Sequence, residues 1–85
     1  MISDLLIKME TEEVYLKNFI EDCLVRYALD GTYWAKFPGE PEYQICRMEH
    51  HELGPDEYAM YEDRDMIFDP IMMGHELTRE EYYNY

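Results

Sequence analysis

The chain has 85 residues, with 20 acidic and 7 basic side chains, so its formal net charge is −13. Hydrophobic residues make up 47% of it and aromatic residues 15%, which is more than a disordered charged segment normally carries. The length excludes a multidomain enzyme, and the charge excludes direct binding to nucleic acid or to an anionic membrane because both would repel the chain. We therefore expect residues 1–85 to form a single small acidic domain.

The compartment is predicted from the first residues and from the cysteines. The longest apolar run near the N-terminus covers residues 5–7, far shorter than a secretory signal core or a membrane span. The two cysteines, Cys23 and Cys46, allow at most one disulfide. Cys23 falls on a predicted apolar stripe, where a reduced thiol packs as a small hydrophobic side chain. These features predict a reduced, cytoplasmic protein.

Residues 11–29 show the clearest helical period. Thr11 can cap a helix and Gly31 can end it. Apolar side chains recur at i, i+3, i+4, i+7, i+8 and i+11, namely Leu16, Phe19, Ile20, Cys23, Leu24 and Tyr27. We therefore predict an amphipathic helix over residues 11–29. Residues 3–10 form either a separate short helix before it or its first turns.

After Gly31 the period changes from 3.6 to 2. Residues 32–37 are rich in β-formers, residues 38–41 favour a turn, and residues 42–48 are typical of a returning strand. This predicts a hairpin with a four-residue loop that covers the apolar face of the helix, with Tyr33, Trp34 and Phe37 as core residues. Residues 66–68 suggest a third strand, closed by Asp69 and Pro70.

The last third of the chain predicts short helices. Residues 55–61 can form one after Gly54, and Thr78 and Glu81 have the spacing of a capping box. The second helix, or an ordered tail, would carry Tyr82, Tyr83 and Tyr85. The predicted fold class is therefore α+β, with one amphipathic N-terminal helix packed on a small antiparallel sheet.

The negative charge is concentrated in the second half of the chain. Residues 1–39 contain seven acidic and four basic side chains, whereas residues 40–85 contain thirteen acidic and three basic ones. A net magnitude of about 2–8 suffices for the solubility of a small domain. The larger excess destabilises the fold through self-repulsion, which suggests a use outside folding. We interpret it as a binding surface for a basic protein; a merely solvated face is the alternative.

The candidate contact residues combine carboxylates with tyrosines. In an extended strand, carboxylates at i and i+2 project to the same side about 7 Å apart, and rows of this kind can occupy the Lys/Arg groove of a nucleic-acid-binding protein. Tyrosines beside them add contact area. The predicted partner-binding residues are Glu40, Glu42, Glu57, Tyr58, Tyr61, Glu62, Asp63, Asp65 and Asp69.

In size and charge the chain resembles the small acidic proteins that mimic DNA, such as phage anti-restriction and anti-CRISPR proteins. The resemblance implies a stoichiometric inhibitor, monomeric or dimeric, that blocks the nucleic-acid groove of a nuclease or other DNA-binding effector. Two alternatives remain open. One is an immunity protein or antitoxin for a basic toxin, and the other is a homo-oligomeric structural or assembly protein.

A metal site is the first rival interpretation. Cys46, His50 and His51 lie within six residues, and Cys23 and His75 lie elsewhere. A zinc site normally needs four ligands in paired spacings, and no second pair accompanies this one. We therefore expect no metal, and read the adjacent histidines as a surface pair that can respond to pH.

Calcium binding and catalysis are also disfavoured. Asp65, Asp69 and Glu76 fall at positions 1, 5 and 12 of an EF-hand loop, but Pro70 occupies the position where the turn requires glycine. The sequence contains no nucleophile, phosphate-binding or dinucleotide motif. We therefore expect a protein that is not an enzyme, with no catalytic residues and no cofactor.

Overall fold

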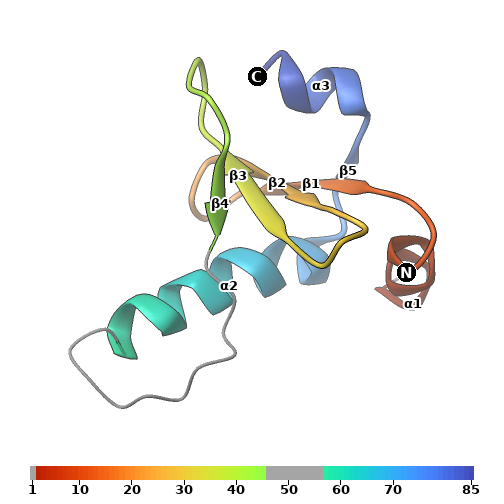
Figure 1. Ribbon diagram of the computed structural model, residues 1–85, viewed down its shortest axis with the longest axis horizontal. Coiled ribbons are helices and arrows are strands. Elements are labelled where there is room, and N and C mark those ends of the chain that lie inside the picture. The colour runs from red at the N-terminus through yellow and green to blue at the C-terminus, as the bar shows by residue number, and fades with distance from the viewer. Residues whose placement is uncertain (1, 46–56) are drawn as a thin grey trace.

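The computed structural model describes residues 2–45 and 57–85, with side chains described for residues 3–45 and 65–85. The fold is α+β, as predicted, and these described residues form three helices and a five-stranded antiparallel sheet (Figure 1). In chain order the elements are α1 (Ile2–Met9), β1 (Val14–Asn18), β2 (Cys23–Tyr27), β3 (Tyr33–Lys36), β4 (Tyr43–Ile45), α2 (Glu57–Met73), β5 (Glu76–Leu77) and α3 (Arg79–Tyr83).

The predicted helix over residues 11–29 is wrong, because this segment forms the β1–β2 hairpin. Val14 pairs with Tyr27 and Asn18 with Cys23. The Asn18 side-chain oxygen accepts the backbone N–H groups of Ile20 and Glu21, at 3.0 and 3.1 Å, and this stabilises the turn. The hairpin is favoured over a helix because other elements cover both faces of its strands. Its apolar side chains are therefore buried without having to lie on one face of a helix.

The other hairpin and the two terminal helices were predicted, but the hairpin loop has six residues rather than four, and residues 46–48 of the predicted returning strand lie outside the described residues. β3 and β4 pair through Ala35 and Tyr43, with residues 37–42 between the strands. α1 begins one residue before the predicted segment 3–10 and ends one residue before the end of that segment. At α3, Thr78 and Glu81 form the predicted capping box, in which each side chain accepts the backbone N–H of the other residue.

The predicted strand over residues 66–68 is also wrong, because these residues lie inside α2. The helix continues through Pro70, which removes one helical hydrogen bond. It ends at Met73, where Gly74 adopts a positive φ of 69° and donates its N–H to the Pro70 carbonyl. Ile67 and Ile71 are buried against the sheet, and their packing outweighs the effect of the proline.

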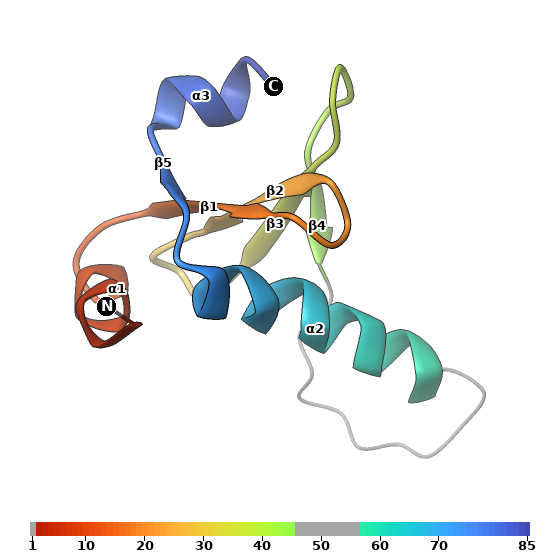
Figure 2. The ribbon, with the colours of Figure 1, turned by 180° about the vertical axis from the view of Figure 1, so that it is seen from behind.

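Helices cover both faces of the sheet, whose strand order is β4-β3-β2-β1-β5. One face packs against α1 and α2, and the other against α3 (Figures 1 and 2). The core of the first face includes Leu16, Val25 and Ile71, and the Tyr27 hydroxyl donates to the Ile67 carbonyl at 2.6 Å. The second face is smaller and more polar.

Candidate protein-binding surface

Most of the predicted contact residues lie on one helix. Seven of the nine are within α2, where Asp65 is exposed and Asp69 is half-buried. The other five belong to the first part of α2, of which the structure describes the backbone and not the side chains, namely Glu57, Tyr58, Tyr61, Glu62 and Asp63. α2 carries five acidic residues and one basic residue, and its N-terminal half extends beyond the sheet (Figures 1 and 2).

The predicted strand-like spacing of these carboxylates is wrong, because residues 57–73 form a helix. The sequence places Asp63 and Asp65 two residues apart, a spacing that puts both carboxylates on one side of a strand, but positions i and i+2 of a helix do not face each other. Asp65 and Asp69, at i and i+4, lie on one face of α2 instead, with Cβ atoms about 5–6 Å apart by helix geometry. Like charges at this spacing destabilise a helix, so they do not serve its folding.

Glu40 lies away from α2. It sits in the exposed turn between β3 and β4, which projects on the opposite side of the sheet from α2 (Figure 1). The structure therefore does not bring Glu40 to the α2 carboxylates.

Glu42 has a structural role that the sequence did not indicate. Its carboxylate accepts two hydrogen bonds from Arg26, at 2.9 and 3.2 Å, and a third from the Tyr82 hydroxyl at 2.7 Å. Arg26 also pairs with Glu13 at 2.9 Å and stacks on Trp34, with 5.2 Å between the guanidinium carbon and the ring centroid. Glu42 is thus occupied within the fold and is removed from the contact set.

Burial and hydrogen bonding oppose each other at this cluster. Burial raises the pKa of Glu42. The hydrogen bonds from Arg26 and Tyr82 and the positive charge of Arg26 lower it by a larger amount, so the pKa of Glu42 lies below its ordinary value. Burial lowers the pKa of Arg26, but bonding to Glu42 and the charge of that carboxylate outweigh it, so the pKa of Arg26 is raised. Both groups are charged at neutral pH.

The C-terminal tyrosines fasten α3 to the second face. Tyr82 is fully buried, with its ring centroid 5.2 Å from that of Tyr15. The Tyr85 hydroxyl accepts from Lys17 at 2.6 Å, and the Tyr85 main-chain oxygen accepts from Lys36 at 2.5 Å. Tyr82 and Tyr85 are therefore held within the fold, whereas Tyr83 is 41% exposed.

Basic side chains in the described part of the chain are all used internally. Lys8 pairs with Glu76 and Lys17 with Asp22, while Arg79 stacks on the ring of Tyr83. Arg26 and Lys36 belong to the contacts given above. Among the described residues, no salt bridge involves the exposed carboxylates Glu10, Glu12, Glu21, Glu40, Asp65 and Glu80. The excess charge is therefore directed outward.

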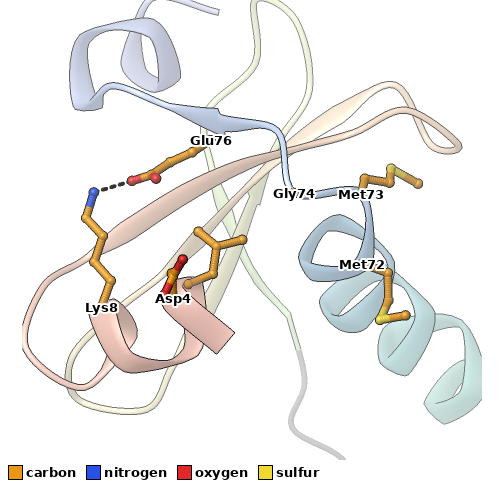
Figure 3. Close-up of a pocket in the computed structure, with 7 residues that line it drawn as sticks. Asp4, Lys8, Met72, Met73, Gly74 and Glu76 are labelled. Atoms are coloured by element: carbon orange, nitrogen blue, oxygen red, sulfur yellow. Dashed lines mark hydrogen bonds and ion pairs between the residues drawn. The ribbon is translucent and has the colours of Figure 1, made fainter. Parts of the chain in front are cut away.

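A polar hollow of about 380 Å³ lies between α1 and the end of α2 (Figure 3). Lys8 and Glu76 close one side of it with their ion pair, and Met72 and Met73 come from the other side. The hollow places one carboxylate, Asp4, beside this pair. It is a charged surface depression without a set of acid, base and nucleophile.

The candidate metal ligands are not brought together in the described part of the chain. Cys46, His50 and His51 lie outside the described residues. Cys23 is buried in the core, and burial raises the pKa of its thiol to about 11. His75 is exposed and packs edge-on against Phe19, with ring centroids 5.3 Å apart. Among the described residues, no three His, Cys, Asp or Glu side chains are grouped so that they could hold a metal ion.

Comparisons of the chain with protein-family models, with curated proteins and with solved structures find no match. Within the described ranges, every helix is too short or too polar to cross a membrane.

Proposed function

We propose that the protein is a stoichiometric inhibitor that binds a basic, nucleic-acid-binding protein and occupies its nucleic-acid groove. The observation that carries this proposal is the grouping of seven predicted contact residues in α2, an acidic helix that extends beyond the sheet. The acidic residues of a projecting helix offer a Lys/Arg-lined groove the negative charge that it normally receives from phosphates.

The pairing of the basic residues supports the same function. Because the described lysines and arginines are occupied within the fold, the exposed carboxylates repel nucleic acid and attract a basic partner. Electrostatic steering of this kind makes association fast and sensitive to salt. The revised contact set is Glu57, Tyr58, Tyr61, Glu62, Asp63, Asp65 and Asp69, all on α2.

The test is a pull-down from a nuclease-treated bacterial lysate at about 0.1 and 0.5 M NaCl, with duplex DNA as competitor. The variant Glu62→Gln/Asp63→Asn/Asp65→Asn removes three charges from α2. The matched control Glu10→Gln/Glu12→Gln/Glu21→Gln removes three charges from two other exposed segments. We expect a discrete partner that DNA displaces, that the α2 variant loses and that the control retains.

Two outcomes would contradict the proposal. Equal capture by the α2 variant and the control would show that the charge on α2 is not the determinant. A smear of basic proteins that disappears at the higher salt would show that the charge acts without specificity. Sedimentation addresses the assembly alternative, because an inhibitor of this kind remains a monomer or dimer whereas an assembly unit forms larger species.

A further inference from the structure

An apolar groove lies beside α2, on the face of the sheet that α1 and α2 cover. It has a volume of about 270 Å³ and is lined by uncharged residues from α1, from α2 and from β2, β3 and the turn between them. Three of its large apolar side chains are well exposed, namely Leu6 at 49%, Leu29 at 57% and Phe68 at 52%. Large apolar side chains gathered around a hollow are typical of a contact surface.

Two acidic residues are immediate sequence neighbours of residues that line the groove. Asp30 lies between two lining residues, Leu29 and Gly31, and Asp69 follows the lining residue Phe68 on α2. Burial raises the pKa of Tyr27 at the groove, and the nearby charge of Asp69 contributes to the same shift. The groove therefore combines an apolar lining with two acidic residues at its edge, Asp30 and Asp69, which we call its acidic rim.

The size and charge of the groove restrict its occupant. Pockets that bury drug-sized ligands measure about 300–1,000 Å³, so this groove suits one or two apolar side chains rather than a whole small molecule. A second copy of the chain would bring one acidic rim against another, with a formal charge of −13 on each protein. A peptide segment with positive charges around an apolar anchor satisfies both features.

We propose that this groove receives the apolar anchor of a basic amphipathic segment of the partner, with Lys/Arg side chains of that segment facing Asp30 and Asp69. This inference rests on the proposed function and specifies where the partner is held. The acidic rim attracts and orients the segment, and the apolar contact with Leu6, Leu29 and Phe68 keeps it bound.

The experiment uses two labelled helical peptides of equal length and charge. One carries lysine and leucine, with leucines at i, i+3, i+4 and i+7, and the other carries alanine in place of each leucine. Binding is measured by fluorescence anisotropy at about 0.1 M NaCl. We expect the lysine–leucine peptide to bind about tenfold tighter or more, which corresponds to burial of at least one leucine side chain.

Two matched double variants locate the site. Leu6→Ser/Leu29→Ser changes one residue of α1 and one turn residue at the groove, and Ile7→Ser/Ile20→Ser changes one residue of α1 and one turn residue elsewhere. All four side chains are at least 49% exposed, so both variants are expected to fold. The first variant should abolish the preference for the lysine–leucine peptide, and the second should leave it within about twofold.

The outcomes separate the two proposals. If both peptides bind equally well in a salt-dependent manner, the groove proposal is overturned while charge-driven binding stands. If neither peptide binds, both proposals lose their support. Dimerisation that Leu6→Ser/Leu29→Ser abolishes would make a second copy the occupant and overturn the groove proposal. Amide NMR shifts of the wild-type protein give a check without mutation, because the peptide should perturb Leu6, Leu29 and Phe68 and leave Ile20 and Glu80 unchanged.

Discussion

Arg26 and Glu42 form a two-point ion pair on the face of the sheet that α3 covers, with N–O distances of 2.9 and 3.2 Å. The side chains are 12% and 23% exposed, so the pair is partly removed from water. Trp34 stacks on Arg26, and Tyr82 donates a hydrogen bond to Glu42 from α3. The pair therefore connects β2, the start of β4 and α3.

The first prediction concerns the loss of this carboxylate. Glu42→Ala leaves Arg26 with Glu13 alone and deprives the Tyr82 hydroxyl of its acceptor. We expect the free energy of unfolding to fall by about 2–4 kcal/mol, because removal of one partner leaves a partly buried charge uncompensated. Urea unfolding measures the change. The control Glu40→Ala, on the exposed turn nearby, should shift it by no more than about 0.5 kcal/mol. Equal effects of the two substitutions would contradict a structural role for Glu42.

The second prediction separates the ring of Tyr82 from its hydroxyl. Tyr82→Phe removes only the hydrogen bond to Glu42 and should cost about 1–2 kcal/mol, whereas Tyr82→Ala also empties a fully buried site and should cost about 3–5 kcal/mol. Thermal unfolding followed by circular dichroism orders the two variants. Tyr83→Ala is the matched control, because this neighbouring ring is 41% exposed and should cost less than Tyr82→Ala.

The third prediction concerns acid. Because the pKa of Glu42 is lower in the folded protein than its ordinary value of 4.5, the unfolded chain binds more protons there as the pH falls. The stability that this carboxylate contributes is thus present above about pH 4.5 and is lost as the pH falls through the folded pKa. Protonation of the many exposed carboxylates relieves repulsion and acts in the opposite direction.

The comparison of wild type with Glu42→Gln isolates this contribution. Unfolding free energies measured between about pH 6 and pH 3 should converge for the two proteins as the pH falls, because the wild-type advantage depends on the ionised carboxylate. A difference that stays constant over this range would show that the charge of Glu42 is not what stabilises the fold.

The fourth prediction tests the attachment of α3. Thr78→Ala removes the side-chain acceptor for the Glu81 N–H and should cost about 1 kcal/mol, the usual value for an N-cap. In Thr78→Ala, amide hydrogen exchange should become faster at residues 81–83 than in the wild type, whereas exchange in β2 should change less. Thr11→Ala is the control, because the Thr11 hydroxyl makes only a 3.4 Å contact with the Lys8 carbonyl.

Local signals in the sequence were sufficient for some elements. The capping box at Thr78 predicted α3, because its two reciprocal hydrogen bonds involve residues three apart. The alternation after Gly31 predicted the β3–β4 hairpin for the same reason, since both strands and their turn lie within a short segment. The acidic character of the second half led to the residues now found in α2.

Residues 11–29 show why the rest was missed. Leu16 and Cys23 fit a helical stripe, but they also face the same side of the β1–β2 hairpin, where both are buried. Phe19 and Ile20, expected in the helix core, are turn residues with 57% and 68% exposure. This hairpin pairs with β3 and β5, which lie outside residues 11–29. Pairing with strands outside a segment produces no pattern in the sequence of that segment from which it could be predicted.

Glu42 was misassigned for a related reason. An acidic side chain in an acidic half of the sequence predicts a solvated or partner-facing position. Its actual partners, Arg26 and Tyr82, lie 16 and 40 residues away and meet it only in the folded protein. Composition identifies where charge accumulates along the chain, but the three-dimensional contacts decide which charges are available to a partner.

The pairing of β1 with β5 also predicts an order of folding. β1 to β4 form successive hairpins, whereas the contact of Tyr15 with Leu77 closes most of the chain into a loop. Loop-closure entropy opposes such a contact until other structure has formed, so β5 and α3 should join after the folding barrier has been crossed. Thr78→Ala should therefore accelerate unfolding and leave the folding rate nearly unchanged. The C-terminal end of the acidic helix α2, which two residues separate from β5, would then be fixed only when β5 pairs with β1.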